Sequence, residues 1–108
     1  MAYTKALAAL ADPSRQEIFQ RLKSGPLAVV EIAQGMPISR PAVSQHLKVL
    51  REARLVAERS EGARHIYFID PSGLAGLRRW LDQFWGDALE AFQAEVEREP
   101  AKGRKSKK

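Results

Sequence analysis

The sequence predicts a mainly α-helical domain with one β-hairpin, in the order four helices, two strands and a last helix. Three observations predict this fold class. Two apolar patterns with helical spacing lie on either side of a short turn that contains Gly35. Two short β-branched and aromatic runs then flank a turn that contains Gly62. One continuous apolar stripe at helical spacing follows over residues 72–99.

The size and composition suit one small globular domain. The chain has 108 residues, of which 44% are hydrophobic, and we place the domain at residues 1–100. Residues 101–108 are of low complexity and basic, and we expect a disordered tail there. The absence of cysteine excludes disulfides and thiolate metal sites. With no secretory signal pattern and no apolar run near about 20 residues, we expect a cytoplasmic protein with no membrane partner.

The charges are unevenly distributed along the chain. Residues 1–69 carry 10 basic and 6 acidic side chains, whereas residues 70–101 carry 3 basic and 7 acidic ones. The tail adds five basic residues, which bring the net charge to +5. A basic half of this kind indicates a polyanionic partner, and an acidic helix would face away from it. The alternative is a surface of randomly mixed charge.

Helix signals open the chain. The first helix is predicted over Tyr3–Ala11, which is rich in Ala and Leu. Asp12 has the position of an N-cap, with Pro13 at the first helical position of a second helix. That helix ends at Gly25 and Pro26. Its apolar residues at helical spacing are Ile18, Phe19 and Leu22.

A third, short helix is predicted over about Val29–Gln34, with Ile32 and Ala33 facing inward and Gly35 ending it. No Ser, Thr, Asp or Asn caps its start, which leaves that boundary open.

Ser39 is expected to cap the fourth helix, which should end near Arg54. Arg40 and Pro41 fall in its first turn, where proline's missing N–H does no harm. The residues that recur at helical spacing on its core face are Val43, Leu47 and Leu50.

A β-hairpin and a long helix complete the prediction. The strands are placed at Leu55–Arg59 and His65–Ile69, around the turn Ser60–Arg64. The long helix runs from about Ser72 to Glu99. Helices three and four have helix-turn-helix spacing, and a hairpin directly after them is a wing. The predicted fold is therefore a winged helix-turn-helix.

The fourth helix divides into two faces. At about 100° per residue, Arg40, Pro41, Lys48 and Arg51 lie within about 60° of Ser44. Gln45 lies about 100° from Ser44, and the aliphatic core residues lie on the other side. A helix that enters the major groove needs this division, since glutamine can pair with adenine and a cation can reach guanine or phosphate. The alternative is an ordinary solvated amphipathic helix. The preceding helix, the short turn and the following hairpin favour the DNA-binding interpretation over it.

His46 and the hairpin take different roles. His46 lies about 200° from Ser44, so we expect it beneath the helix or hydrogen-bonded at its edge. Arg59, Arg64 and His65 flank the hairpin turn, where cations contact phosphates or the minor groove. The alternative is a solvated tip in which Glu58 and Glu61 compensate the charge. The tail either attracts DNA non-specifically or only aids solubility.

The sequence resembles the ArsR-type (arsenic-repressor-type) winged-helix regulators of bacteria. The resemblance rests on Ala8–Arg15 with the apolar residues after it, on Ser39–Leu50, and on Leu55-Val56 with Gly62–Tyr67. It covers roughly residues 5–95. It implies a homodimer that binds a palindromic operator in double-stranded DNA, usually as a repressor, and hence at the nucleoid. By position, the DNA-reading residues are Ser39, Arg40, Ser44, Gln45 and Lys48, with Arg64 in the wing.

The chain departs from the metal sensors of that family. Their cysteine motif in the third helix is replaced by Val29–Ala33, and the last helix has no histidine. The only histidines are His46 and His65, both in the DNA-binding half. A zinc or nickel site needs converging His, Cys or carboxylate ligands. We therefore expect a non-metal-sensing branch, with no cofactor and no metal site.

The last helix carries more apolar surface than one small domain would cover, which favours a symmetric dimer. The residues assigned to dimerisation are Leu7, Leu10, Trp80, Phe84, Trp85, Leu89 and Phe92. A small-molecule effector could lie between their aromatic rings, but core packing explains the same residues more simply, and the protein is equally compatible with no ligand.

Two other function classes agree less well with the sequence. A winged helix that binds protein would present a more apolar face than that of Arg40, Ser44, Gln45 and Lys48. An enzyme is not supported, because the sequence has no cysteine nucleophile, no phosphate loop and no useful pairing of His with carboxylate. The candidate DNA-binding set is Ser39, Arg40, Pro41, Ser44, Gln45, Lys48, Arg51, Arg59, Arg64 and His65.

Overall fold

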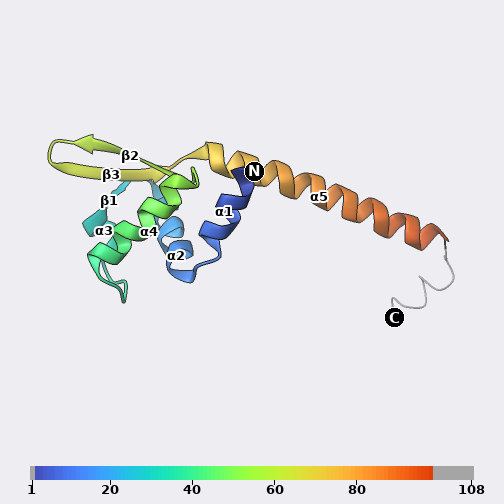
Figure 1. Ribbon diagram of the computed structural model, residues 1–108, viewed down its shortest axis with the longest axis horizontal. Coiled ribbons are helices and arrows are strands. Elements are labelled where there is room, and N and C mark those ends of the chain that lie inside the picture. Colours follow the sequence, from blue (N-terminus) through green and yellow to red (C-terminus); the bar gives the residue numbers. More distant parts are fainter. Residues whose placement is uncertain (1, 99–108) are drawn as a thin grey trace. The chain divides into compact units, whose positions relative to one another are not determined.

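The computed structural model describes residues 2–98; the predicted tail and the predicted domain end at residue 100 lie outside the described residues. The chain forms two compact units, Met1–Leu77 and Arg78–Lys108. Five α-helices, one 3-10 helix and three strands occur within the described residues (Figure 1). The predicted order of helices, hairpin and last helix is confirmed. No helix in the described part of the chain is long and apolar enough to cross a membrane.

Helices α1 (Ala2–Leu10) and α2 (Pro13–Arg21) are joined by a capped turn. As predicted, Asp12 is the N-cap of α2, since its Oδ1 accepts from the backbone N–H groups of Ser14 at 2.8 Å and Arg15 at 3.1 Å. The 3-10 helix η1 (Leu22–Ser24) follows α2 directly. It ends at Gly25, whose φ of 139° favours glycine.

Helix α3 (Val29–Ala33) begins without a side-chain cap from its N-cap residue, Ala28. The Glu31 carboxylate instead accepts the N–H of Ala28 at 2.7 Å, which satisfies a donor at the helix start. The left-handed φ of 79° at Gly35 ends this region as predicted.

Helix α4 (Arg40–Glu52) is capped by Ser39, whose Oγ accepts the N–H of Ala42 at 3.2 Å. Its end is a Schellman motif with Arg54 at a φ of 62°. The N–H of Leu55 bonds to the carbonyl of Leu50, and the N–H of Arg54 bonds to that of Arg51. This turn directs the chain from α4 into the hairpin.

The sheet has one strand more than the sequence indicated. Strands β2 (Val56–Glu61) and β3 (Arg64–Ile69) form the predicted hairpin, but they extend closer to the turn than expected because Glu61 pairs with Arg64. Strand β1 (Leu27–Ala28) pairs antiparallel with β3, which gives the order β1-β3-β2. The prediction of a two-stranded hairpin alone was therefore incomplete.

The core lies between the helices and the sheet. The apolar residues predicted to face inward on α4 are completely buried, as are those of α2 and α3 at Ile18 and Ile32. Phe19 and Ala33 are only partly buried and pack against this core. The largest fully buried side chains are Ile18, Leu22, Ile32, Val43, Leu47, Leu50, Leu55 and Val56. Truncating one of these to alanine typically costs about 2–5 kcal/mol.

Helix α5 (Pro71–Arg98) begins against the turn after α4. The Gly73 N–H donates to the carbonyl oxygen of Arg54 at 2.9 Å, and Asp70 Oδ1 accepts from the N–H of Ser72. A Cβ built on Gly73 would lie 2.3 Å from that Arg54 oxygen. Only glycine therefore permits this approach.

Candidate nucleic-acid interface

The outer face of α4 is exposed, small and basic. Every residue predicted to read DNA from this helix is exposed in the described structure, whereas the aliphatic residues on the other face are buried. Ser39, at the N-cap, is exposed as well. The exposed set on the helix itself is Arg40, Pro41, Ser44, Gln45, Lys48 and Arg51. The division into two faces that the spacing predicts is therefore present in the folded chain.

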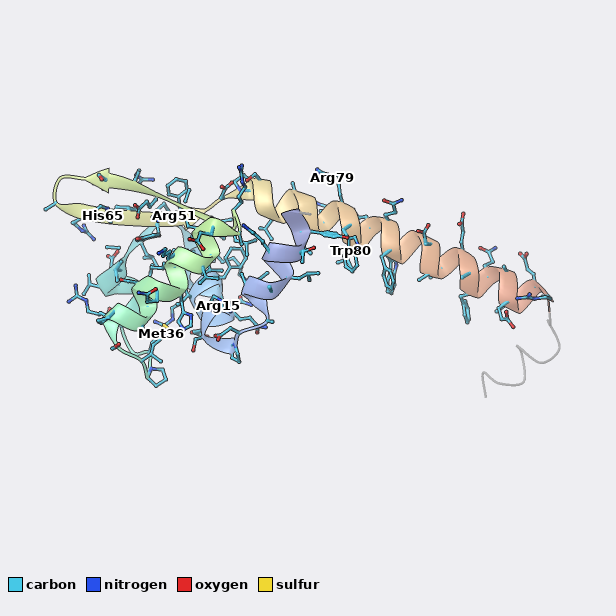
Figure 2. The ribbon with its side chains drawn as sticks, in the orientation of Figure 1. Arg15, Met36, Arg51, His65, Arg79 and Trp80 are labelled. Atoms are coloured by element: carbon cyan, nitrogen blue, oxygen red, sulfur yellow. The ribbon has the colours of Figure 1, made fainter. Side chains whose placement is uncertain are left out.

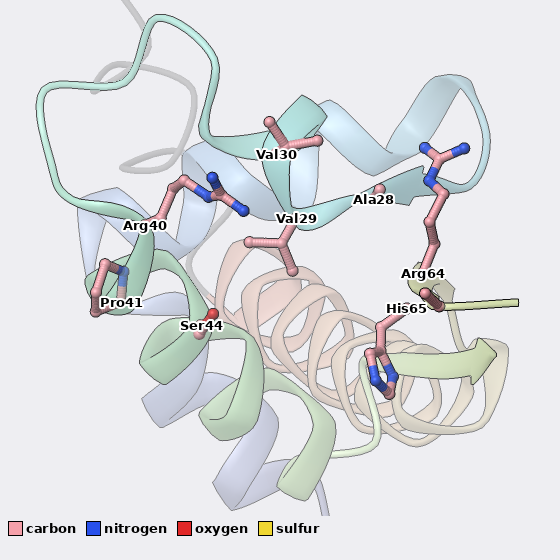
Figure 3. A pocket seen from close by; sticks show the side chains of 9 residues that line it. Ala28, Val29, Val30, Arg40, Pro41, Ser44, Arg64 and His65 are labelled. Carbon is pink, nitrogen blue, oxygen red and sulfur yellow. The ribbon is translucent and has the colours of Figure 1, made fainter. Parts of the chain in front are cut away.

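A groove lies between the start of α4 and the wing (Figure 3). Its volume is about 710 Å³. Arg40, Pro41 and Ser44 line it from α4, and Arg64 and His65 line it from β3. These are five of the predicted DNA-binding residues, and the fold brings them together from two segments of the chain. Val29 and Val30 lie between the two sides and were not predicted as part of the site.

The two sides of the groove differ in how their cations are compensated. Arg40 has no carboxylate partner among the described residues. Across the groove, Arg64 Nη2 lies 3.5 Å from Oε1 of Glu31. His65 Nδ1 lies 3.9 Å from Oε2 of Glu58. The α4 side therefore presents an arginine without a carboxylate partner among the described residues, whereas Arg64 and His65 on the wing side lie near carboxylates.

Glu58 also contacts the end of α4. Its Oε2 lies 3.1 Å from Nη1 of Arg51 and 3.9 Å from Nδ1 of His65. Figure 2 labels Arg51 and His65, which come from α4 and β3. Burial, together with this carboxylate, raises the pKa of Tyr67 to about 12. Tyr67 is the Cα partner of Glu58 across the hairpin. Glu58, on β2, thereby links α4 to β3. The DNA contacts of Arg51 and His65 stay predictions.

Arg59 lies farther along the hairpin and is also paired. Its Nε donates to Glu61 Oε2 at 2.9 Å, and its guanidinium lies 5.5 Å from the centroid of the Phe68 ring. The sequence left open whether Glu58 and Glu61 compensate the cations of the wing. In the structure Glu61 pairs with Arg59, whereas Glu58 lies 3.9 Å from His65 and pairs with Arg51 of α4.

His46 lies on the inner side of α4 and is partly buried, as its helical angle predicts. Its Nδ1 lies 3.3 Å from Nη1 of Arg15. Arg15 also donates from Nε to the carbonyl of Ala9 at 2.7 Å. The backbone N–H of Arg15, more than any other group, holds the pKa of the Asp12 carboxyl below its ordinary value. These contacts connect α1, the start of α2 and α4.

Arg21 supports the turn between α3 and α4. Its Nη1 donates to the carbonyl of Ile32 at 3.0 Å and to that of Gln34 at 2.5 Å, while its Nε donates to Glu17. Sequence reasoning missed Arg15, Arg21 and Glu31. Their contacts with His46, with the carbonyls of Ile32 and Gln34, and with Arg64 span 11 to 33 positions, so no local pattern indicates them.

The exposed part of α5 forms a continuous apolar stripe on one helix. Its large side chains are 37% to 62% exposed, and the rings of Trp80 and Phe84 stack with centroids 5.6 Å apart. On α1, Leu7 is 44% exposed and Leu10 is partly buried. The exposed large apolar residues of the stripe are Trp80, Leu81, Phe84, Trp85, Leu89 and Phe92. Apolar patches of this kind usually mark an interaction surface.

No group of three or more His, Cys, Asp or Glu side chains that could hold a metal ion occurs within residues 2–98. The sequence also lacks cysteine, and α5 contains no histidine.

The known proteins to which the chain is similar are transcriptional regulators and repressors. Residues 10–59 match a family model described as a helix-turn-helix domain. The HTH-type transcriptional regulator Rv2034 of Mycobacterium tuberculosis is 54% identical over 88% of this chain and 89% of its own length. The transcriptional repressor SdpR of Bacillus subtilis is 30% identical over 70% of this chain and 84% of its own. The arsenical resistance operon repressor of Staphylococcus xylosus is 34% identical over 70% and 73%.

Solved structures agree with these relatives. A possible transcriptional regulator for arsenical resistance superposes with a TM-score of 0.69 at 45% identity, covering 82% of this chain and 93% of that one. The homodimeric winged helix-turn-helix DNA-binding domain Mb0332 of Mycobacterium bovis, a possible ArsR-family regulator, gives a TM-score of 0.64 at 29% identity, covering 83% of each chain.

Proposed function

The chain belongs to the ArsR family of winged helix-turn-helix transcriptional regulators, and we propose that it binds a palindromic operator as a homodimeric repressor. The family is one of DNA-binding proteins and not of enzymes. A repressor of this kind works at the nucleoid, where its operator lies.

The groove between α4 and the wing is the observation that carries this proposal. Arg40 lines it from α4, Arg64 and the imidazole of His65 line it from the wing, and the small side chain of Ser44 lines it as well. Short side chains permit the close approach of a DNA backbone, and flanking cations neutralise its phosphates. The exposed face of α4, with Arg40, Ser44, Gln45 and Lys48, is polar and basic, whereas a surface built for a protein partner would have an apolar centre.

The proposed roles follow from position on α4. Gln45 and Lys48 are exposed near the middle of the helix, where side chains of a recognition helix reach base edges. Glutamine can form two hydrogen bonds with adenine, and lysine can reach guanine. Arg40 lies in the first turn and Arg64 on the wing, where phosphate contacts fix the orientation of the helix.

The apolar stripe of α5 supports the dimer. A second copy would cover the stripe in an isologous interface, in which the same surface is used by both subunits. Two recognition helices about 34 Å apart would then meet successive major grooves, which explains why the operator should be a palindrome. The homodimeric domain from Mycobacterium bovis offers a precedent in a structure of the same fold.

Binding to DNA from upstream of the chain's own gene tests the proposal. Fluorescence anisotropy with that DNA and with a scrambled duplex of the same composition would measure both affinity and sequence preference. We expect Gln45→Ala with Arg40→Ala to reduce the preference, since one good bidentate contact discriminates by about 1–3 kcal/mol. Arg64→Ala should weaken binding to both duplexes and reduce the slope of log affinity against log salt by about 0.9.

Arg79→Ala is the matched control. It removes the same charge from an exposed position on α5 that lies neither in the groove nor in the apolar stripe. A wild-type protein without any sequence preference would contradict the proposed function. Equal binding by the Gln45 and Arg40 double variant would instead show that the reading face is elsewhere.

We also propose that the regulatory signal is not a metal ion held by cysteine. The lack of cysteine in the chain and of histidine in α5 supports this branch of the family. An apolar small molecule between the aromatic side chains of two α5 helices is one alternative signal, and control by protein abundance is the other. Quenching of the Trp80 and Trp85 fluorescence by a panel of apolar ligands would distinguish them, since abundance control requires no ligand.

A further inference from the structure

Strand β1 brings a carboxylate to a DNA-binding cation of the wing. β1 pairs with β3 at Ala28 and Ile66, so Glu31, three residues beyond Ala28, comes close to Arg64, two residues before Ile66. Glu31 Oε1 lies 2.7 Å from the N–H of Ala28 and 3.5 Å from Nη2 of Arg64. One carboxylate oxygen therefore serves both the start of α3 and the wing.

The contact between Glu31 and Arg64 is accessible to a competing anion. The two side chains are 47% and 57% exposed, and Arg64 lines the same groove as Arg40. An exposed ion pair stabilises a fold little, so its loss would not unfold the wing. A DNA phosphate in the groove would compete with the Glu31 carboxylate for Arg64, because both groups are anions.

We propose that Glu31 is an affinity-determining residue, which holds Arg64 in the free protein and must be displaced from it by a DNA phosphate. The inference rests on the proposed function. Each phosphate contact at Arg64 then replaces an existing ion pair instead of neutralising a free cation. Arg40, which has no carboxylate partner within the described residues, makes its phosphate contact without this competition.

Glu31→Gln isolates the competition from the structural role of Glu31. Glutamine keeps an oxygen that can accept the N–H of Ala28, but it loses the charge that attracts Arg64. We expect the variant to bind operator DNA about two- to fivefold more tightly at low salt, the range expected for an exposed ion pair. Its unfolding temperature should stay close to that of the wild type.

A double-mutant cycle with Arg64→Ala distinguishes local competition from a general change in charge. If Glu31 acts through Arg64, the gain from Glu31→Gln disappears in the Arg64→Ala background. Glu90→Gln on α5 is the matched control, since it removes one exposed negative charge far along the chain from the groove. Its effect should be small and the same in both backgrounds.

Two results would overturn the inference while leaving the proposed function intact. One is a wild type that binds with sequence preference and a Glu31→Gln variant of unchanged affinity. The other is a gain that persists undiminished in the Arg64→Ala background. A wild type without sequence preference would overturn the proposed function and this inference together.

Discussion

Nη1 of Arg15 lies 3.3 Å from Nδ1 of His46, which joins the start of α2 to the inner side of the recognition helix. Arginine only donates, so Nδ1 of His46 is the acceptor in this contact. Arg15 is largely covered, with 19% of its side chain exposed. The pair therefore holds the inner side of α4 against the start of α2 and leaves the outer face of α4 exposed.

Replacing Arg15 with methionine should lower stability and DNA affinity together. The variant keeps much of the side-chain volume but loses the bonds to His46 and to the carbonyl of Ala9. Losing hydrogen bonds from a charged donor costs about 1–3 kcal/mol. Urea unfolding and DNA titration measure the two effects. Arg79→Met, the same change at an exposed site, should alter neither, and a normal Arg15→Met protein would refute the positioning role.

Arg21 should matter for DNA binding without contacting DNA. Arg21→Met removes the donors to the carbonyls of Ile32 and Gln34, which precede the turn into α4. We expect faster amide exchange at Gly35 and Met36 and several-fold weaker operator binding, because the turn orients the recognition helix. Lys23→Met, an identical loss of charge at an exposed neighbour, is the control. Unchanged exchange in the Arg21 variant would contradict this role.

How much of the fold the sequence predicts depends on how far apart in the sequence the interacting residues are. The cap at Ser39 and the buried series Val43, Leu47 and Leu50 are local, and the structure confirms them. Strand β1 has two residues and forms only because Tyr67 and Ile66 lie opposite it. A pairing over about 40 positions leaves no periodic pattern in the sequence, so β1 was missed.

The same distinction holds for the candidate site. The exposed face of α4 follows from helical angles and was predicted residue by residue. The pairing of Arg64 with Glu31 and of Arg51 with Glu58 depends on how the sheet packs beside α3 and α4. The sequence offered only Glu58 and Glu61 as partners of the basic residues at the hairpin turn. It did not indicate Glu31, because side chains far apart in the sequence carry no signal of such contacts.

Two glycines at the start of α5 should respond to alanine in opposite directions. At Gly73 a Cβ would lie 2.3 Å from the Arg54 oxygen, so Gly73→Ala must displace the backbone and should cost about 1–3 kcal/mol. At Gly76 nothing lies within 4 Å, and Gly76→Ala should stabilise the helix by about 0.5–1 kcal/mol. Thermal unfolding of both variants tests this, and two shifts of the same sign would contradict the packing at Gly73.

The capping carboxylate of Asp12 should make stability fall at low pH. Its pKa is below the ordinary 3.8 in the folded chain, chiefly because the Arg15 N–H bonds to it. A lowered folded-state pKa gives stability that is present above the ordinary value and lost as the pH falls through the folded one. Asp12→Asn keeps a capping oxygen without this ionisation. The difference in unfolding temperature between wild type and variant should therefore shrink below pH 3.8, and a difference independent of pH would disprove the linkage.

The exposed stripe of α5 provides the test of the dimer. Trp85 is 62% exposed, so Trp85→Glu should leave the folded chain intact and act on whatever covers the stripe. Large aromatic residues often dominate interfaces, and we expect self-association to weaken by at least about tenfold, with a parallel loss of affinity for a palindromic duplex. Gln83→Glu introduces the same charge about 160° away on the helix and should change neither quantity.

Sedimentation equilibrium measures the self-association of the Trp85→Glu and Gln83→Glu variants directly. Because a half-site binds one subunit, its affinity should fall much less than that of the palindrome in the Trp85 variant. An undiminished dimer in Trp85→Glu would mean that the stripe is not the interface, whatever the DNA result.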